Sequence, residues 1–258
     1  MLTLLSDFGY QDVYVGVMKG AIATIDPQLK VVDLTHAILP QNVAAGSFAL
    51  MNAYSYFPLG TVHVAVIDPG VGSQRRGIAI KIKEGFLVGP DNGLFSGILA
   101  QSPAIAAVEL TNPQYWRLSS PSYTFHGRDI FAPVGAHLGN GVPLKELGEE
   151  IDVNSLVRLP LSTYEVTPEK IIGFIQYIDH FGNLITNIPA SEVKGKSWFV
   201  LVGNQEIPAT QTYSDRPLEE LIALIGSHGW LEIAVNGGSA KEVLGISWGD
   251  KIEVVSGR

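Results

Sequence analysis

The chain has 258 residues, of which 46% are hydrophobic and 16% are charged, a composition that predicts a folded protein rather than a disordered one. Its 25 acidic and 17 basic residues give a net charge of −8, and the densest basic pair is Arg75-Arg76, which argues against binding to nucleic acid. The absence of cysteine excludes disulfides, thiolate metal ligands and a cysteine nucleophile.

The amino-terminal segment carries no signature of a targeting or membrane segment. It lacks a basic region before its apolar residues and reaches an acid at Asp7, so we do not expect a signal peptide. No uninterrupted apolar run in the chain approaches the roughly 18 residues needed to span a bilayer. We therefore expect a cytoplasmic protein with no membrane partner and no nucleic-acid partner.

The first half of the chain alternates between strand-like and helix-like patterns. Strands are predicted at residues 2–5, 30–34, 61–67, 77–82, 86–88 and 105–110, and helices at 13–25, 42–56, 92–99 and 130–138. This alternation predicts a layered α/β domain over residues 1–165 with a mostly parallel central sheet. Ligands of such sheets bind at the carboxyl ends of the strands, which is where Asp7 and Asp68 fall.

The pattern changes after Pro168 to strand-like runs separated by Gly, Asn and Pro. Strands are predicted at residues 170–178, 184–188, 197–202, 230–235 and 251–255, with one helix at 217–225. These patterns predict a small all-β second domain over residues 166–258.

Two acidic motifs of the first domain have a functional and a structural interpretation. Asp7 at a strand end, followed by a glycine, suits a hydroxyl-rich ligand such as a ribose, but it is also typical of a turn or helix cap. Asp68 precedes glycines that let the backbone approach a ligand, and Arg75 or Arg76 can pair with its carboxylate. A hairpin turn capped by an ion pair is the alternative.

Further polar motifs are also open to two interpretations. His126 stands before an apolar helix and can titrate near neutral pH, or it is a solvent-facing residue at a helix entrance. The acid, aromatic, glycine and amide of residues 179–183 suit a purine or form a bulged hairpin. The six histidines show no metal-ligating spacing, so we expect neither a catalytic metal nor a cofactor.

The ordered set of motifs resembles the S-adenosyl-L-methionine (SAM) hydroxide adenosyltransferase family, which is related to fluorinase and chlorinase. The motifs are SDFG at residues 6–9 with Asp12, DPGVG at 68–72 with Arg75-Arg76, GPDNG at 89–93, TFHGR at 124–128, IDHFGN at 178–183 and NGGS at 236–239. They run in order through nearly the whole chain.

The resemblance implies a larger α/β domain followed by a small β-barrel domain. It also implies a homotrimer whose active sites lie between the first domain of one subunit and the second domain of its neighbour. The implied reaction is hydrolysis of SAM to adenosine and L-methionine, by in-line attack of water on the ribose 5′-carbon.

Residue by residue, the resemblance implies a catalytic triad and a set of substrate contacts. The triad is Asp68, Arg75 and His126, with Asp68 orienting water or accepting its proton, His126 sharing the proton and Arg75 fixing the carboxylate. Among the implied substrate contacts, Asp7 holds the ribose hydroxyls, and Asp179 holds the methionine ammonium with Asp12 nearby. Asn183 and Phe181 contact the adenine, and the backbone at Gly237 contacts the adenine edge. Ser227 binds the methionine carboxylate, and Thr124 and Asn236 complete the set.

Departures from the halide-using relatives predict that this chain does not halogenate. Those relatives carry tyrosine in place of Asp68, threonine in place of Arg75 and Tyr-Ser in place of His126-Gly127, and a carboxylate repels a halide while it accepts a proton from water. Two further departures concern the methionine end: His228 replaces an arginine and Gln41 a tryptophan. A non-catalytic SAM- or adenosine-binding protein and a metal-dependent phosphohydrolase remain alternatives.

Overall fold

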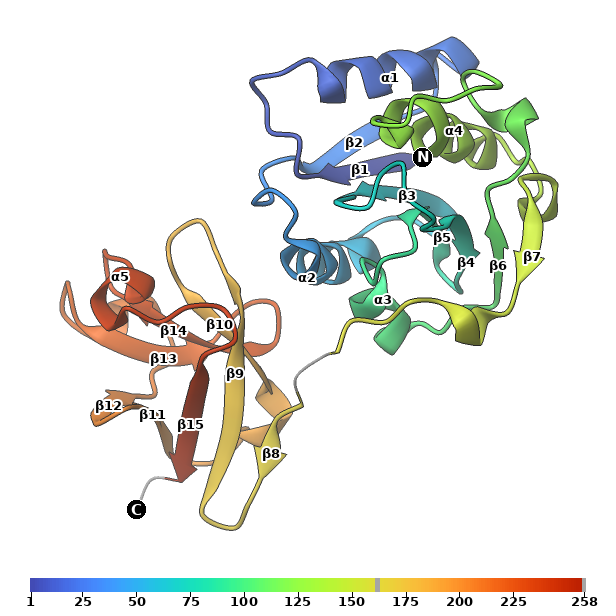
Figure 1. Ribbon diagram of the computed structural model, residues 1–258. Helices are drawn as coiled ribbons and strands as arrows, with labels where there is room; N and C mark the ends of the chain where they lie inside the picture. Colours follow the sequence, from blue (N-terminus) through green and yellow to red (C-terminus); the bar gives the residue numbers. More distant parts are fainter. Residues whose placement is uncertain (161–162, 257–258) are drawn as a thin grey trace. The chain divides into compact units, whose positions relative to one another are not determined.

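The computed structural model describes residues 1–160 and 163–256 (Figure 1). The chain divides into two compact units, Met1–Leu159 and Pro160–Arg258. Among the described residues, no helix is long and apolar enough to cross a membrane.

The first unit is built on a mixed sheet with the strand order β2-β1-β3-β5-β4-β6-β7. Its strands are β1 (Leu2–Ser6), β2 (Val31–Thr35), β3 (Thr61–Val66), β4 (Gly77–Lys81), β5 (Gly85–Pro90), β6 (Ala106–Glu109) and β7 (Glu149–Ile151). Neighbours from β2 to β5 pair in parallel, whereas β4 pairs antiparallel with β5 and β6, and β6 with β7.

The expectation of a mostly parallel sheet is therefore wrong, although the α/β class is confirmed. The reason lies in the connection between β4 and β5, where residues 82–84 are too few for a crossover helix. A connection of that length forces an antiparallel hairpin, and this hairpin separates the parallel half of the sheet from its antiparallel edge.

Two helices cover each face of this sheet (Figure 1). On one face, α1 (Tyr14–Ile25) and α4 (Ala132–Gly139) bury residues such as Met18 and Val134 against β1 and β3. On the other face, α2 (Val43–Ala53) and α3 (Ser96–Gln101) pack Leu50 and Ile98 onto the sheet. Because β1 and β3 lie between two layers, every residue of both strands is buried.

Short helical turns complete the two units. Turns of 3-10 type occupy Tyr54–Tyr56, Pro113–Tyr115, Leu144–Glu146, Val153–Ser155, Ala190–Glu192 and Tyr213–Asp215. A π-helical turn, Gly127–Phe131, precedes α4 directly. Such turns insert an extra residue and are frequent at functional sites.

The second unit is a curved, nearly closed sheet with the strand order β12-β11-β15-β9-β10-β14-β13. Its strands are β8 (Glu165–Val166), β9 (Lys170–Ile178), β10 (Leu184–Pro189), β11 (Trp198–Val202), β12 (Gln205–Pro208), β13 (Leu221–Ile225), β14 (Trp230–Val235) and β15 (Lys251–Ser256). A bridge between Ala209 and Ala223 connects the two ends of this order, so the sheet approaches a barrel. The unit also contains a short helix, α5 (Ala240–Leu244).

The helix predicted at residues 217–225 is wrong, because its second half is strand β13. Leu221 to Ile225 pair in unbroken antiparallel register with β14. A short, continuous apolar run does not distinguish a buried strand from a buried helix by periodicity, and here the pairing with β14 decides the structure.

Candidate active site

Asp68, Arg75 and His126 form one hydrogen-bonded cluster in the first unit. The Nε of Arg75 donates to Oδ1 of Asp68 at 2.9 Å, and a terminal guanidinium nitrogen donates to Oδ2, so the pairing is bidentate. The same terminal nitrogen lies 2.7 Å from Nδ1 of His126. Asp68 and Arg75 have side-chain exposures of 6% and 12%, so the pair is largely shielded from water.

Burial and the neighbouring arginine together favour the neutral form of the histidine. A guanidinium group only donates hydrogen bonds, so Nδ1 of His126 accepts, and the proton of the neutral ring is assigned to Nε2. Burial lowers the pKa of His126, and the charge of Arg75 lowers it further, while Asp68 and Asp129 oppose this shift. His126 is therefore a neutral residue with a donor at Nε2.

The two loops that carry the triad pack on each other through a glycine. Asp68 and Arg75 lie in the loop between β3 and β4, and Gly72 in that loop has a φ of +78°. A Cβ at Gly72 would lie 2.5 Å from the carbonyl oxygen of Tyr123, in the segment that leads to His126. Only a glycine permits this approach, which brings the two halves of the triad together.

Phe131, a buried phenylalanine of the π-helical turn, contacts two residues of the triad. The ring of Phe131 is fully buried, and the guanidinium carbon of Arg75 lies 5.3 Å from its centroid. The His126 ring approaches the same ring edge-on at 6.4 Å. Sequence reasoning missed Phe131 because nothing distinguishes it from an ordinary core residue.

A buried carboxylate fixes the segment that precedes His126. Asp129 is fully buried, accepts hydrogen bonds from Arg128 at 2.7 and 2.8 Å, and pairs with Arg117 at 3.3 Å. It also accepts the backbone N–H of Ser122 at 2.9 Å. The sequence motifs did not indicate this role of Asp129.

The second arginine of the predicted pair has a different partner. Arg76 donates from Nε to Asp91 at 2.9 Å, and Asp91 also accepts the backbone N–H of Val157. This assigns Arg75 rather than Arg76 to Asp68, and it places the GPDNG motif in a structural contact outside the triad.

Asp7 lies at the same edge of the sheet as Asp68. Strands β1 and β3 are parallel neighbours with Ser6 opposite Val66, so the residues that follow the two strands leave the sheet side by side. The ring of Phe8 contacts Phe125 at 5.5 Å, which joins this turn to the His126 segment. Among the other predicted substrate contacts of this unit, Asp12 and Thr124 lie in exposed loops.

The turn between β9 and β10 is organised by Asp179. Its Oδ1 accepts the backbone N–H groups of Phe181 and Asn183 at 2.9 Å each, and its Oδ2 accepts the side-chain amide of Asn183 at 2.9 Å. Phe181 is 73% exposed at the tip. The hairpin interpretation of this motif is therefore correct, and an exposed aromatic ring with a fixed amide beside it also suits a planar base.

The segment that follows Gly237 lies against this turn, since a Cβ at Gly182 would collide with Oγ of Ser239, whereas Ser227 lies elsewhere in the unit. The backbone of Lys241 donates to Gly182 at 3.0 Å, and the Asn236 side chain donates to the carbonyl of Arg216 at 2.7 Å. Ser227 is exposed in the hairpin at the opposite end of β14, whose six residues span roughly 20 Å at about 3.3 Å per residue. Within this unit, the predicted contacts thus form two separate groups.

His228 holds its own hairpin. Its Nδ1 accepts the backbone N–H of Trp230 at 3.1 Å, and its Nε2 lies 3.2 Å from the buried carboxylate of Glu232. Both ring nitrogens therefore have partners within the hairpin, so His228 does not present the donors of the arginine that it replaces.

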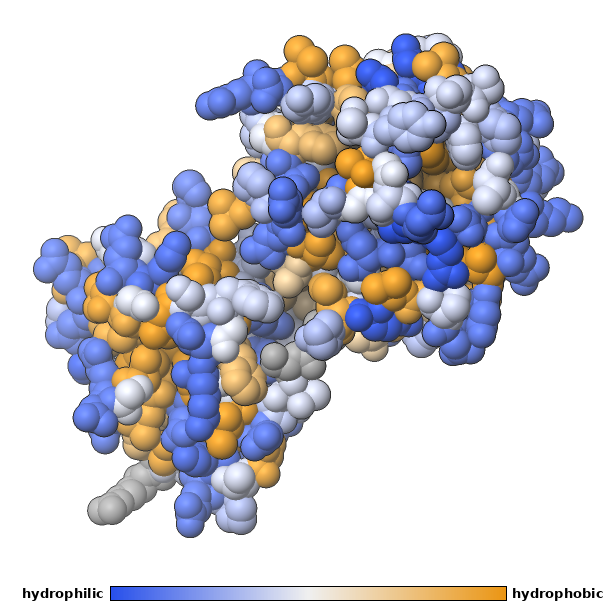
Figure 2. Space-filling view, viewed as in Figure 1, coloured by the Kyte–Doolittle hydropathy of each residue, from blue (hydrophilic) through white to orange (hydrophobic). Residues whose placement is uncertain are grey.

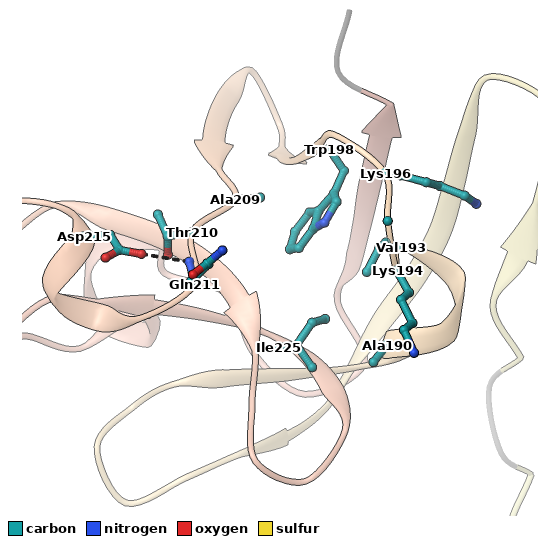
Figure 3. Close-up of a pocket in the computed structure, with 11 residues that line it drawn as sticks. Ala190, Val193, Lys194, Lys196, Trp198, Ala209, Thr210, Gln211, Asp215 and Ile225 are labelled. Carbon is teal, nitrogen blue, oxygen red and sulfur yellow. Dashed lines mark hydrogen bonds between the residues drawn. The ribbon is translucent and has the colours of Figure 1, made fainter.

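A cavity of about 750 Å³ in the second unit is lined by other residues (Figure 3). It is lined by Ala190, Val193, Lys194, Gly195, Lys196, Trp198, Ala209, Thr210, Gln211, Asp215 and Ile225. None of these is a predicted site residue. Within residues 1–160 and 163–256, no group of three or more His, Asp or Glu side chains is placed to hold a metal.

Comparisons with known proteins match nearly the whole chain to one family. Sequence models for the SAM hydroxide adenosyltransferase N-terminal and C-terminal domains match residues 2–148 and 173–253. The (R)-S-adenosyl-L-methionine hydrolase of Thermus thermophilus is 41% identical over 257 residues, covering 97% of this chain and 98% of the relative. The enzyme of the same name from Salinispora tropica is 38% identical, covering 99% and 98%.

A solved structure shares the fold as well. The crystal structure of an uncharacterized conserved protein from Thermotoga maritima superposes with a TM-score of 0.93 at 38% identity, covering 99% of this chain and all of that one. Two domain matches and full-length identity near 40% leave one assignment: this chain belongs to the SAM hydroxide adenosyltransferase family.

Proposed function

We propose that this chain hydrolyses S-adenosyl-L-methionine to adenosine and L-methionine. The observation that carries the proposal is the assembled Asp68–Arg75–His126 cluster, in a chain whose full-length relatives are SAM hydrolases. A carboxylate in a fixed position at the carboxyl edge of a sheet is equipped to orient a water molecule and to receive its proton.

The proposed substrate makes the chemistry undemanding for the protein. Its sulfonium is a cationic leaving group, which departs as the neutral thioether of methionine. Water forms the new C–O bond at the 5′-carbon as the C–S bond breaks, and the water loses one proton. Neither an acid for the leaving group nor a metal or cofactor is needed, so the protein contributes positioning and a proton acceptor.

The hydrogen-bond directions favour Asp68 as the proton acceptor. In His126, Nδ1 already accepts from Arg75 and Nε2 carries the proton, so the neutral ring offers no lone pair in its plane. Each carboxylate oxygen of Asp68 accepts one bond from Arg75 and retains a further acceptor position. His126 then serves as a donor that orients the water oxygen.

The remaining residues are proposed to bind the substrate. We assign the ribose hydroxyls to Asp7, the adenine to Phe181, Asn183 and the backbone at Gly237, and the methionine ammonium to Asp12 and Asp179, with Thr124 and Asn236 beside them. Ser227 lies at the opposite end of β14 from the Asp179 turn, so we do not assign it to the same methionine. The cation-binding part of this set is acidic, as a sulfonium and an ammonium require.

We further propose a homotrimer in the cytoplasm, in which the second unit of a neighbouring subunit completes each site. The first unit exposes apolar side chains in the segments that follow Asp7 and precede His126: Tyr10 is 65% exposed, Val13 72% and Tyr123 80%. Figure 2 shows apolar side chains at the surface over α1. Exposed apolar residues gathered on one region mark an interaction surface.

The direct test is to incubate the purified chain with SAM, with and without a chelator, and to identify the nucleoside formed. We expect adenosine and methionine in equal amounts, unaffected by the chelator or by added halide. Binding of SAM without any product would identify a sensor instead. Activity on phosphoesters that the chelator abolishes would identify a phosphohydrolase.

A further inference from the structure

A fully buried histidine, His36, lies behind the turn that carries Asp7. Ser6 Oγ lies 2.7 Å from Nδ1 of His36, and the N–H of Gly9 donates to the His36 carbonyl at 2.8 Å. The N–H of His36 donates to the Tyr10 hydroxyl at 3.3 Å, and the Tyr10 ring stands edge-on to the imidazole at 5.6 Å. One residue thus contacts the Asp7 turn on both sides.

An irregularity between β1 and β2 brings His36 into this place. Leu4 pairs with Asp33, but the next residue, Leu5, pairs with Thr35, so β2 contains one extra residue. Continuing this register sets His36 beside Ser6. Bulges of this kind are used in sheets to redirect a side chain, and they are frequent next to functional sites.

The hydrogen bonds around His36 have one consistent direction. Nε2 of His36 lies 3.2 Å from Oδ1 of Asp33, although the two atoms are poorly aligned for a hydrogen bond. The negative charge of the carboxylate favours a proton on this nitrogen. Nδ1 therefore accepts the Ser6 hydroxyl proton, and the Ser6 oxygen accepts the N–H of Phe8 at 3.3 Å. Lys19 holds the other oxygen of Asp33 at 2.6 Å.

We infer that His36 is a positioning residue, which fixes the Asp7 turn so that the carboxylate meets the ribose hydroxyls. The inference rests on the proposed function, which assigns the ribose to Asp7. A second contact restrains the carboxylate itself, because Oδ2 of Asp7 accepts the N–H of Gln41 at 2.7 Å. The Ser6–His36 pair fixes the backbone of the turn, and the Gln41 contact fixes its side chain.

The molecule contains a matched control for this pair. Thr3 Oγ1 lies 2.8 Å from Nδ1 of His63, and both residues are buried, as Ser6 and His36 are. The chemistry is the same, a hydroxyl of β1 bound to an imidazole. However, Thr3 and His63 pair in the amino-terminal half of β1 and β3, at a distance from the turn that carries Asp7.

The experiment compares the dissociation constants of adenosine and 2′,3′-dideoxyadenosine, which lacks both hydroxyls. The wild type is expected to bind adenosine roughly tenfold to hundredfold more tightly, because hydrogen bonds to a charged carboxylate contribute binding free energy of that order. Ser6→Ala and His36→Leu should each lower this preference severalfold. His36→Asn, whose amide oxygen takes the place of Nδ1, should retain most of it, and Thr3→Ala and His63→Leu should leave it unchanged.

The outcomes separate the inference from the proposed function. Suppose that the wild type prefers adenosine, but that Ser6→Ala and His36→Leu raise the dissociation constants of adenosine and dideoxyadenosine by the same factor, or raise neither. The positioning role of His36 is then wrong, while the ribose assignment stands. Without discrimination in the wild type, the assignment to Asp7 fails and the inference fails with it. Ser6→Ala removes only one hydroxyl, so it decides the question even if His36→Leu does not fold.

Discussion

Arg75 contacts both of the other residues of the triad. Its two hydrogen bonds hold Asp68 in one orientation, while burial and its third contact lower the pKa of His126. All three residues stand in motifs that carry the family resemblance, and the structure places them in one hydrogen-bonded cluster. The motifs by themselves left open which arginine pairs with Asp68 and which group accepts the proton, since both depend on the directions of side chains.

Replacing Asp68 by asparagine tests the proton acceptor. Asp68→Asn should lower the turnover number by roughly a hundredfold to ten-thousandfold, as the loss of a general base does, while the dissociation constant of adenosine changes little. Adenosine formation and equilibrium binding measure the two effects. Undiminished turnover would contradict the assignment of Asp68.

The pH dependence of kcat/KM tests the state of His126. Its pKa is lowered by burial and by Arg75, so the ring is neutral from neutral pH down to below the ordinary histidine value of about 6.5. Protonation at Nδ1 would place a charge against Arg75 and disrupt the triad. We expect activity to decline only below pH 6.5, and a decline centred above that value would contradict a depressed pKa.

At the scale of elements, the site depends on loops that a sequence describes poorly. The strands 170–178 and 230–235 are predicted to the residue, because apolar runs bounded by turn residues mark them clearly. The same reasoning could not foresee that β4 and β5 form a hairpin, or that 221–225 is a strand. Those outcomes follow from connection length and from the pairing partner.

Gly72→Ala tests the contact between the two triad loops. The new Cβ would both strain a left-handed backbone and collide with the Tyr123 carbonyl, so activity should fall at least tenfold. Gly60→Ala is the matched control, since Gly60 has a φ of +85° but open space around it. Both should lower stability by about 1 kcal/mol for the backbone alone, and equal activity in the two variants would contradict the contact.

The buried His63 on β3 makes the first unit sensitive to acid. Burial lowers its pKa to about 4, so between pH 6.5 and 4 the unfolded chain binds a proton that the folded chain does not. The free energy of unfolding should therefore fall by about 3 kcal/mol over this range. Denaturant unfolding at several pH values measures it, and His63→Leu should show a correspondingly flatter dependence.

At the scale of the molecule, the alternation of predicted strands and helices indicated the class of each unit, and the order of the motifs indicated the family. The near closure of the second sheet was implied only by the resemblance, because the bridge of Ala209 to Ala223 has no sequence signature. The exposed apolar residues of the first unit belong to the same scale, since a composition cannot say which of its apolar residues reach the surface.

The proposed trimer predicts a mass of three chains by size exclusion with light scattering. Val13→Glu places a charge on an apolar residue that is 72% exposed, and it should dissociate the assembly and abolish SAM hydrolysis together. Ile105→Glu alters a residue that is 59% exposed near β6, and it should preserve both. A monomeric wild type with full activity would contradict the shared site.

The π-helical turn has a consequence for how this segment tolerates change in its length. Each residue of a regular helix advances the chain by about 100°, and a π turn contains one residue more than an α turn. Deleting one residue other than Asp129 between Gly127 and Phe131 would convert the wide turn into a regular α turn, in which His126 and Phe131 stay about one turn apart and keep a similar relative orientation. This segment should therefore tolerate a one-codon deletion better than a one-codon insertion, which would leave two extra residues for the helix to accommodate.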